Sequence, residues 1–340
     1  MNKIAIVILN WNGVKYLEKF LEKVVLYSGD CRIVLADNAS SDDSVAFVQK
    51  AFPQVEIVLN SENGGFAKGY NDALKRIDAE FYILLNSDIE VTPNWVDPLL
   101  KQMNDPSIAG CQPKVLSYDQ RTMFEHAGAS GGFLDKNYYP FCRGRIFDQF
   151  ESDNGQYEGE IEVFWATGAA LMIRSELYHK IGGLDDYFFA HMEEIDLCWR
   201  LKKQGYRFTV VPSSVIYHVG GGTLAYNSPK KLYLNFRNSL FMIVKNHEGI
   251  LFFKLVNRMI LDGIAAFRFL AKGEFRNFKS VFNAHITMYM RLPILLKQRK
   301  EIKANSLKFN SKGLYKGNIL WARYFKGIVY FKDLNQRFFD

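Results

Sequence analysis

Short apolar runs alternate with amphipathic helical patterns through the first third of the chain, and this rhythm restricts the possible folds more than any other feature. The apolar runs are rich in Val, Ile and Leu and cover residues 3–10, 32–37, 55–60 and 81–86. Between them, apolar residues recur at spacings of three and four in residues 14–27, 43–52 and 65–77. Strands without polar alternation are typical of sheets covered on both faces, and strand–helix–strand units join parallel neighbours. The sequence therefore predicts an α/β fold with a doubly wound sheet.

Each of these four predicted strands ends in small polar residues. The four endings read "NWNG", "DNASSDDS", "NSENGG" and "NSD". Doubly wound sheets bind ligands beyond the carboxyl ends of their strands, so we expect a polar ligand there. The first strand is not followed by the G-x-G-x-x-G of dinucleotide-binding folds, and the chain has no Walker A loop. These absences argue against both of those classes of nucleotide-binding protein.

Two aspartates at the strand ends each allow two interpretations. Asp37 either belongs to a capping network for the next helix or accepts a hydrogen bond from a nucleotide base or ribose. Asp88 follows Asn86 at the end of a buried strand, where a carboxylate is a natural ligand for Mg²⁺ or Mn²⁺. The alternative for Asp88 is a turn aspartate preceding Thr92 and Pro93.

The segment "FFAHMEEIDLCWRL" places three acids in an apolar stretch. If a helix begins near Met192, Asp196 and Arg200 form an i,i+4 pair, with Glu193 close to them. Glu194 then points about 100° away from Glu193, in a first turn where the helix dipole favours an ionised carboxylate. Such a carboxylate can serve as a general base. The alternative is that all three acids only mark the start of a helix.

Beyond residue 105 the pattern is mixed. Residues 162–183 resemble a strand leading into a short helix, and residues 206–223 contain a second strand-like run that ends at His218. Three glycines follow soon after His218 and would let a ligand approach the backbone. Taken alone, a histidine in this position is more often an ordinary, partly buried residue than a metal ligand.

Charge divides the chain into two unequal parts. Residues 1–229 hold 21 Lys and Arg against 30 Asp and Glu, a net charge of −9, whereas residues 230–340 hold 22 against 6, a net of +16. In the basic part, one helical face carries Phe252, Leu255, Met259, Phe267 and Leu270, and another carries Lys254, Arg258, Arg268 and Lys272. No apolar run is long enough to span a bilayer.

Three environments suit this basic part. It can lie on an anionic membrane surface, which we expect. It can instead pack on the rest of the chain with its basic face in solvent. Nucleic acid is the third option, and no known nucleic-acid-binding motif accompanies the charge, so we expect no nucleic-acid partner.

Six motifs in order and spacing resemble those of bacterial glycosyltransferase family 2. They are "IVILNWNG", "LADNASSDDS", "NGGFAKGYNDAL", "LLNSD", "TGAALMIRSELYHKIGGLDDYFFAHMEEIDLCWRLKKQGY" and "IYHVGGGT". The likeness covers roughly residues 3–225 and is greatest to the branch that contains rhamnosyltransferases and related cell-surface polysaccharide enzymes. It implies a GT-A fold with a mixed sheet, in which residues 1–228 form the catalytic domain. Residues 1–105 would bind the nucleotide-sugar, residues 106–228 the acceptor, and residues 229–340 would be a basic helical appendage.

The resemblance also implies roles for particular residues. The nucleotide-sugar would contact Asn10, Asp37, Asn63, Gly64, Gly65, Phe66, Asn71, Asn86 and Ser87. The acceptor would lie near Thr167, Gly168 and Asp196. Asp88 and His218 would hold Mg²⁺ or Mn²⁺ together with phosphate oxygens, because the first acid of the family's D-x-D motif is Asn86 here. Glu194 matches the second acid of the family's "ED" pair, the catalytic base, and Glu193 is the other candidate because the pair reads Glu-Glu.

The expected activity is that of an inverting, metal-dependent glycosyltransferase. It would move a sugar from a dTDP- or UDP-linked donor, with dTDP-rhamnose as one candidate, to a hydroxyl of a glycan or lipid-linked acceptor in surface polysaccharide synthesis. The alternatives are a catalytically inactive nucleotide-sugar-binding module and a nucleotidyltransferase. The first residues do not look like a signal peptide, so we expect a cytoplasmic protein, peripheral on the inner face of the cell membrane.

Overall fold

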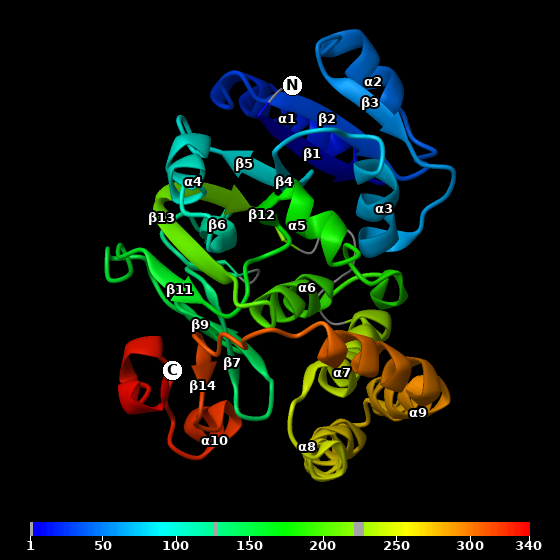
Figure 1. Ribbon diagram of the computed structural model, residues 1–340, viewed down its shortest axis with the longest axis vertical. Coiled ribbons are helices and arrows are strands. Elements are labelled where there is room, and N and C mark those ends of the chain that lie inside the picture. Colours follow the sequence, from blue (N-terminus) through cyan, green and yellow to red (C-terminus); the bar gives the residue numbers. More distant parts are fainter. Residues whose placement is uncertain (1–2, 126–127, 221–227) are drawn as a thin grey trace.

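The computed structural model describes residues 3–125, 128–220 and 228–340. Within them, nine strands form one mixed sheet with the order β11-β13-β6-β12-β4-β1-β2-β3, and β5 pairs with β13 (Figure 1). The strands are β1 (Ile4–Asn10), β2 (Arg32–Asp37), β3 (Glu56–Leu59), β4 (Phe81–Asn86), β5 (Ile89–Val91), β6 (Ile108–Ser117), β11 (Ile161–Val163), β12 (Ala170–Arg174) and β13 (Arg207–His218). Strands β1 to β4 pair in parallel, whereas β12 is antiparallel to β4 and β6. The predicted doubly wound, mixed α/β sheet is therefore confirmed.

Six helices in the described residues before position 220 flank this sheet. They are α1 (Val14–Tyr27), α2 (Ser44–Ala51), α3 (Gly65–Leu74), α4 (Val96–Gln102), α5 (Ser175–Lys180) and α6 (Glu193–Lys202), and a 3₁₀ turn, η1 (Asp186–Phe188), precedes α6. Alternate residues of β1 enter two different cores: Ile6 packs with Leu17 of α1, and Val7 packs with Tyr70 of α3. Helices thus cover both faces, which is why the strands lack polar alternation.

A smaller sheet lies beside the large one. Its order is β10-β9-β8-β7-β14, formed by β7 (Gly132–Asp135), β8 (Pro140–Cys142), β9 (Arg145–Ile146), β10 (Gln149–Phe150) and β14 (Leu314–Tyr315). β14 comes from the C-terminal segment and pairs in parallel with β7. The last residues therefore return to the body of the protein, which the amphipathic pattern alone did not predict.

Three long helices make up most of the region after residue 228. They are α7 (Pro229–Asn246), α8 (Leu251–Ala271) and α9 (Phe275–Ala304), followed by α10 (Ile319–Tyr324), η2 (Phe331–Asp333) and η3 (Gln336–Phe338). α7 packs against α6 and α9, and α9 packs against α8. In Figure 1, α8 and α9 lie at the opposite end of the molecule from α2 and β3. Since α6 also contacts β13, α6 and α7 connect the long helices to the large sheet.

The orientation of α8 differs from one of the interpretations of the sequence. A basic side facing solvent would expose Arg258, but that residue is buried, whereas Phe252 and Phe267 are exposed. The alternative in which these helices pack with a solvated basic face is therefore wrong for Arg258, which pairs with the buried Asp262 of the same helix.

Candidate functional site

The carboxyl ends of β1 to β4 and the loops after them bring most of the predicted donor-side residues to one edge of the sheet. These residues are Asn10, Asp37, Asn63, Gly64, Gly65, Phe66, Asn86, Ser87 and Asp88. Asn10 and Asp37 are direct partners in the β1–β2 register, and Asn10 Nδ2 donates to Asp37 Oδ1 over 3.1 Å. Asp37 Oδ2 accepts from the Ser40 amide over 2.9 Å. Asp37 therefore organises the loop after β2. It does not cap the next helix, since α2 follows Asp43 and no side chain makes a capping hydrogen bond there.

The loop between β3 and α3 is shaped by side-chain amides. Asn63 Oδ1 accepts from the Gly65 amide and from Asn38 Nδ2, each over 3.0 Å. Gly65 has a φ of +80°, and a β-carbon there would lie 2.5 Å from the ring of Phe189, so only glycine fits. The Phe66 amide donates to the carbonyl of Phe189 over 2.6 Å. Sequence reasoning missed Asn38, whose only signal was its place in the polar stretch after β2.

Asn71 binds a different part of the chain from the other residues predicted to contact the donor. Its Nδ2 donates to the Leu184 carbonyl over 2.7 Å and to Asp186, while its Oδ1 accepts from the Tyr178 hydroxyl over 2.6 Å. Because both ends of this amide bind the segment around residue 184, Asn71 joins α3 to residues 178–186. The structure does not bring it to the strand ends with the other predicted donor residues.

Asp88 and His218 meet where β5 and β13 pair. His218 Nε2 lies 3.1 Å from Asp88 Oδ1, and His218 Nδ1 lies 2.9 Å from Glu125 Oε2. Burial alone would lower the pKa of His218, but the charges of Asp88 and Glu125 and their hydrogen bonds outweigh it and raise the pKa to about 10. Without a metal the ring is therefore a cation between two carboxylates, and binding a metal through Nε2 requires the loss of the proton on that nitrogen. Sequence reasoning did not single out Glu125 as part of this group.

This arrangement fits a divalent cation. Neighbouring ligands in an octahedral shell at about 2.1 Å from the metal are about 3 Å apart, close to the separation of Asp88 Oδ1 and His218 Nε2. A carboxylate on the far ring nitrogen, as Glu125 provides, is the common way to orient a metal-binding histidine. Across the described residues, no group of three or more His, Cys, Asp and Glu side chains is arranged to hold a metal. The protein thus offers two ligands, and the substrate would have to supply others.

The two adjacent glutamates begin α6, as predicted, and both are desolvated. Burial raises the pKa of Glu194 to about 7, and burial followed by the charge of Glu194 raises the pKa of Glu193 well above its usual value. The Oε2 atom of each has no hydrogen-bond partner within the described residues. The helix dipole was expected to favour the ionised form of Glu194, and here burial outweighs it.

Glu194 and Phe66 both border Gly168. A β-carbon added to Gly168 would lie 3.2 Å from Phe66 Cζ and 3.7 Å from Glu194 Cβ. The adjacent Thr167 is fixed by its amide, which donates to Gln112 Oε1 over 2.9 Å. The structure therefore brings a predicted donor residue, a predicted acceptor residue and the predicted base into contact distance.

Asp196 is part of the scaffold. It is fully buried and accepts from Arg200 Nε over 2.8 Å, as the helical spacing predicted. Lys245 and Asn246 of α7 donate to the same carboxylate over 2.9 and 2.8 Å. With three protein donors around it and no exposure, Asp196 is not placed to contact an acceptor, contrary to its assignment from the resemblance. Two further Arg200 donors go to the carbonyls of residues 181 and 183. Within the described residues Arg200 forms its ion pair with Asp196 and not with Glu193.

The segment before α6 has an unusual backbone. Phe189, His191 and Met192 have φ angles of 64°, 73° and 72°. Residues other than glycine rarely adopt such backbone angles. Asn238 of α7 is buried, and its Nδ2 donates to the carbonyls of Phe188, Ala190 and His191 over 2.9, 2.9 and 2.7 Å. A residue of the basic region thus fixes the loop that leads into the two glutamates, and its sequence context, an amphipathic helix, gave no signal of this.

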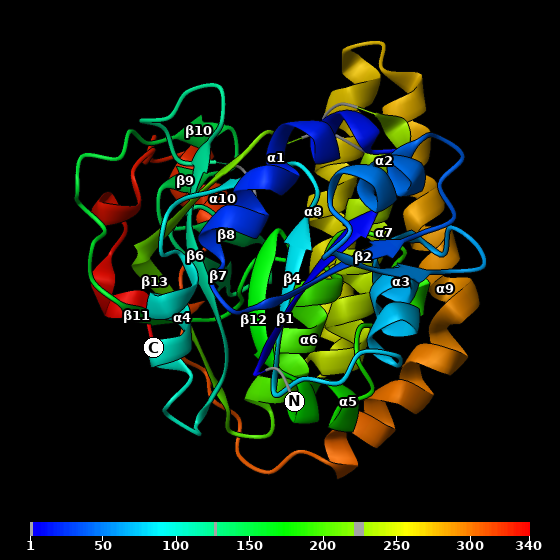
Figure 2. The ribbon, with the colours of Figure 1, turned by 90° about the horizontal axis from the view of Figure 1, so that it is seen from above.

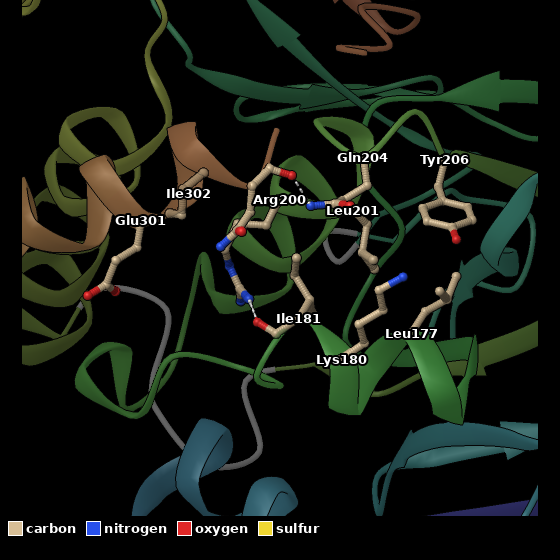
Figure 3. Close-up of a pocket in the computed structure, with 10 residues that line it drawn as sticks. Leu177, Lys180, Ile181, Arg200, Leu201, Gln204, Tyr206, Glu301 and Ile302 are labelled. Atoms are coloured by element: carbon tan, nitrogen blue, oxygen red, sulfur yellow. Dashed lines mark hydrogen bonds between the residues drawn. The ribbon is translucent and has the colours of Figure 1, made fainter. Parts of the chain in front are cut away.

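Two cavities lie behind α6, away from these glutamates. One, of about 380 Å³, is lined by residues of α5, α6 and α9, including Lys180, Arg200 and Glu301 (Figure 3). The other, of about 520 Å³, shares Arg200 and includes Asn71 and Asp186. In Figure 3 the Arg200 guanidinium points to the carbonyl of Ile181, where it donates a hydrogen bond over 2.9 Å. Because the strand-end residues do not line these cavities, the candidate site rests on the strand ends and α6.

Known proteins resemble this chain in sequence over most of its length. The model of the family described as Glycosyl transferase family 2 matches residues 5–181. An N-acetylglucosaminyl-diphospho-decaprenol L-rhamnosyltransferase of Mycobacterium tuberculosis is 22% identical over 72% of this chain and 85% of its own length. A pre-mycofactocin glycosyltransferase of the same organism is 26% identical over 58% of this chain and 39% of its own.

Two solved structures share the fold. The mannosyltransferase PcManGT from Pyrobaculum calidifontis, in complex with GDP-Man and Mn²⁺, aligns with a TM-score of 0.52 at 12% identity, over 90% of this chain and 86% of its own. GalNAc-T7 with UDP, GalNAc and Mn²⁺ aligns with a TM-score of 0.54 at 15% identity, over 72% of this chain and 48% of its own. At these identities the likeness shows the GT-A fold alone. Together with the family match over more than half of the chain, it places this protein in glycosyltransferase family 2, with rhamnosyltransferase-like sequence.

Proposed function

We propose that this glycosyltransferase is an inverting enzyme that uses Glu194 as its general base. The observation that carries the proposal is the position of Glu194 beside Gly168 and Phe66, with one buried oxygen unpartnered within the described residues and a pKa of about 7. A base works best when its pKa lies near the working pH, since it is then ionised yet still accepts a proton readily. Glu193 is more deeply buried and its pKa is raised further, so we assign it a protonated, supporting role.

The donor is proposed to be a dTDP- or UDP-linked sugar, with dTDP-rhamnose the first to test. It would lie over the ends of β1, β2 and β4, where Asn10, Asp37 and Ser87 gather and the loop carrying Phe66 closes one side. The support for rhamnose is the name of the mycobacterial relative. The two solved structures that share the fold contain UDP and GDP-Man, and this supports a donor that carries a nucleoside diphosphate.

Asp88 and His218 are proposed to hold Mg²⁺ or Mn²⁺ beside the donor diphosphate. Such a cation offsets the negative charge that grows on a leaving nucleoside diphosphate. Asp88 Oδ1 and His218 Nε2 would face the cation, and Glu125 would keep the ring oriented through Nδ1. Both solved structures contain Mn²⁺, which supports this assignment.

The acceptor is proposed to be a hydroxyl of a glycan or lipid-linked sugar, bound near Thr167 and Gly168. The relative named for N-acetylglucosaminyl-diphospho-decaprenol supports a lipid-linked acceptor. An enzyme with such a substrate would work on the inner face of the cell membrane, where the net charge of +16 of residues 230–340 would favour anionic lipid.

The test is a panel of nucleotide-sugars with Mg²⁺ or Mn²⁺, measured by thermal shift and by release of nucleoside diphosphate. We expect stabilisation by one donor with metal, slow donor hydrolysis by wild type, and loss of turnover without loss of donor binding in Glu194→Gln. Glu176→Gln, at an exposed position at the start of α5, is the matched control and should behave as wild type. Donor binding without any turnover would indicate an inactive binding module. Formation of a nucleoside triphosphate and a sugar 1-phosphate from the nucleotide-sugar and added pyrophosphate would indicate a nucleotidyltransferase.

A further inference from the structure

The side of α8 that faces away from the protein is apolar. Phe252, Phe253, Ile260, Ile264 and Phe267 are each between 59% and 69% exposed. Val256 and Met259 complete the same side at 37% and 44%. A helix on the surface of a water-soluble protein normally turns polar residues outward. The outer side of α8 is thus unsuited to water along most of its length.

The side of α8 that faces the protein is polar. Arg258 and Asp262 are buried and form an ion pair at 3.1 Å. Arg258 also donates to Ser239 Oγ of α7 over 2.9 Å, and Asp262 accepts from the Tyr139 hydroxyl over 3.0 Å and lies 3.1 Å from His285 Nε2 of α9. Because hydrogen bonds between α8 and three other elements fix this orientation, simple rotation of the helix would not bury its apolar side.

The apolar surface continues onto α9. Phe282, Ile286, Tyr289 and Met290 are exposed there, and the Tyr289 hydroxyl lies 2.8 Å from Met259 Sδ of α8. We call these four residues, with Phe252, Phe253, Val256, Met259, Ile260, Ile264 and Phe267, the apolar face. Figures 1 and 2 show α8 and α9 side by side at one end of the molecule, where the apolar face is carried by two packed helices. Exposed apolar surface of this extent marks an interaction site.

Basic residues adjoin the apolar face. Arg268, Lys272, Arg276 and Lys279 are exposed around the turn from α8 to α9, and Lys297 and Lys300 are exposed further along α9. Within the described residues, no helix has both the length and the apolar character needed to cross a bilayer. An apolar face beside cations on a helix that cannot span is the pattern of a segment lying in the membrane interface.

We propose that the apolar face of α8 and α9 inserts into the surface of an anionic lipid bilayer, with the basic residues on the headgroups. This deepens the proposed function, on which it rests, by assigning membrane contact to apolar side chains of two helices rather than to charge alone. A second copy of this chain is a poorer occupant, because it would bring the same exposed cations opposite these.

The test compares wild type with Phe253→Gln/Ile260→Gln/Phe267→Gln in sedimentation with vesicles of phosphatidylglycerol and phosphatidylcholine. All three side chains are exposed, so the variant should fold with an unchanged melting temperature. We expect its partition coefficient to fall on the order of 1,000-fold, since each of the three large apolar side chains contributes roughly tenfold when it is buried. Leu26→Gln/Leu307→Gln/Phe325→Gln changes equally exposed residues outside the apolar face and should bind as wild type does.

Several results would overturn the inference. One is equal vesicle binding by wild type and the apolar-face variant, and another is binding that vanishes entirely in high salt, which would assign it to charge. A third is that wild type forms a dimer, the variant is a monomer, and neither protein binds vesicles. Donor hydrolysis in solution without vesicles should be the same in both proteins. If neither protein hydrolyses the donor, the proposed function is contradicted, whereas the vesicle measurement still tests whether the apolar face binds lipid.

Discussion

Asn238→Leu removes one side-chain amide from α7 and replaces it with a side chain of about the same size. The substitution tests whether α7 fixes the loop at residues 188–192 that leads into the two glutamates. Asn238 Nδ2 serves three carbonyls at 2.7 to 2.9 Å. The two N–H groups of this amide are shared among the three carbonyls, so about two hydrogen bonds of roughly 1 kcal/mol each are lost, and a buried carbonyl left unpaired costs more. We therefore expect the free energy of unfolding to fall by about 3 kcal/mol. Urea denaturation measures this loss.

The same substitution should slow catalysis more than it weakens donor binding. Phe189, His191 and Met192 each hold a left-handed backbone that costs about 1–3 kcal/mol, so the loop can relax once its carbonyls are released. A shift of about 1 Å in Glu194 would lower kcat roughly 100-fold. The KM for the donor should change less than kcat, because Asn238 does not contact the strand ends and the loop meets the donor side where Phe189 accepts from the Phe66 amide.

The control is Asn235→Leu, in the same helix and less buried. It should keep both the stability and the kcat of wild type. If Asn238→Leu loses about 3 kcal/mol of stability but keeps its kcat, the loop is fixed by other contacts and the reasoning fails.

Three further predictions concern the same site. Because the pKa of Glu194 is raised to about 7, kcat/KM should fall as the pH drops below about 7 and level off above it, and a flat profile from pH 6 to 8 would refute its role as base. Lys245→Met leaves the buried Asp196 with less compensation and should lower the free energy of unfolding by about 3–5 kcal/mol, measured in urea; a loss under about 1 kcal/mol would show that Lys245 contributes little. Asp88→Asn and His218→Ala should each abolish the thermal stabilisation that Mn²⁺ with donor gives wild type, and unchanged stabilisation in both would place the metal elsewhere.

Local sequence was sufficient for the sheet and for part of the site. The strand runs and helical spacings predicted β1 to β4 and α1 to α3 to within a few residues, because each is a continuous segment whose periodicity reflects its own burial. The pair of Asp196 and Arg200 followed from helical spacing for the same reason. Asp88 and His218 were assigned together from the resemblance, and the structure places them 3.1 Å apart.

Contacts between distant segments decided the rest. Asn71 and Asp196 look like ligands in isolation, but their partners lie 113 and 49 residues away, at Leu184 and Lys245, and use up their polar atoms. The amphipathic pattern of α8 likewise predicted which residues share a face of the helix. Which face is turned outward was decided by the buried ion pair of Arg258 and Asp262. Periodicity fixes the relative angles of side chains around a helix axis, whereas their environment depends on what packs against that helix. The sequence by itself therefore determined the elements and the strand-end chemistry, and the tertiary structure alone decided which polar groups are already satisfied and which apolar surface is left to water.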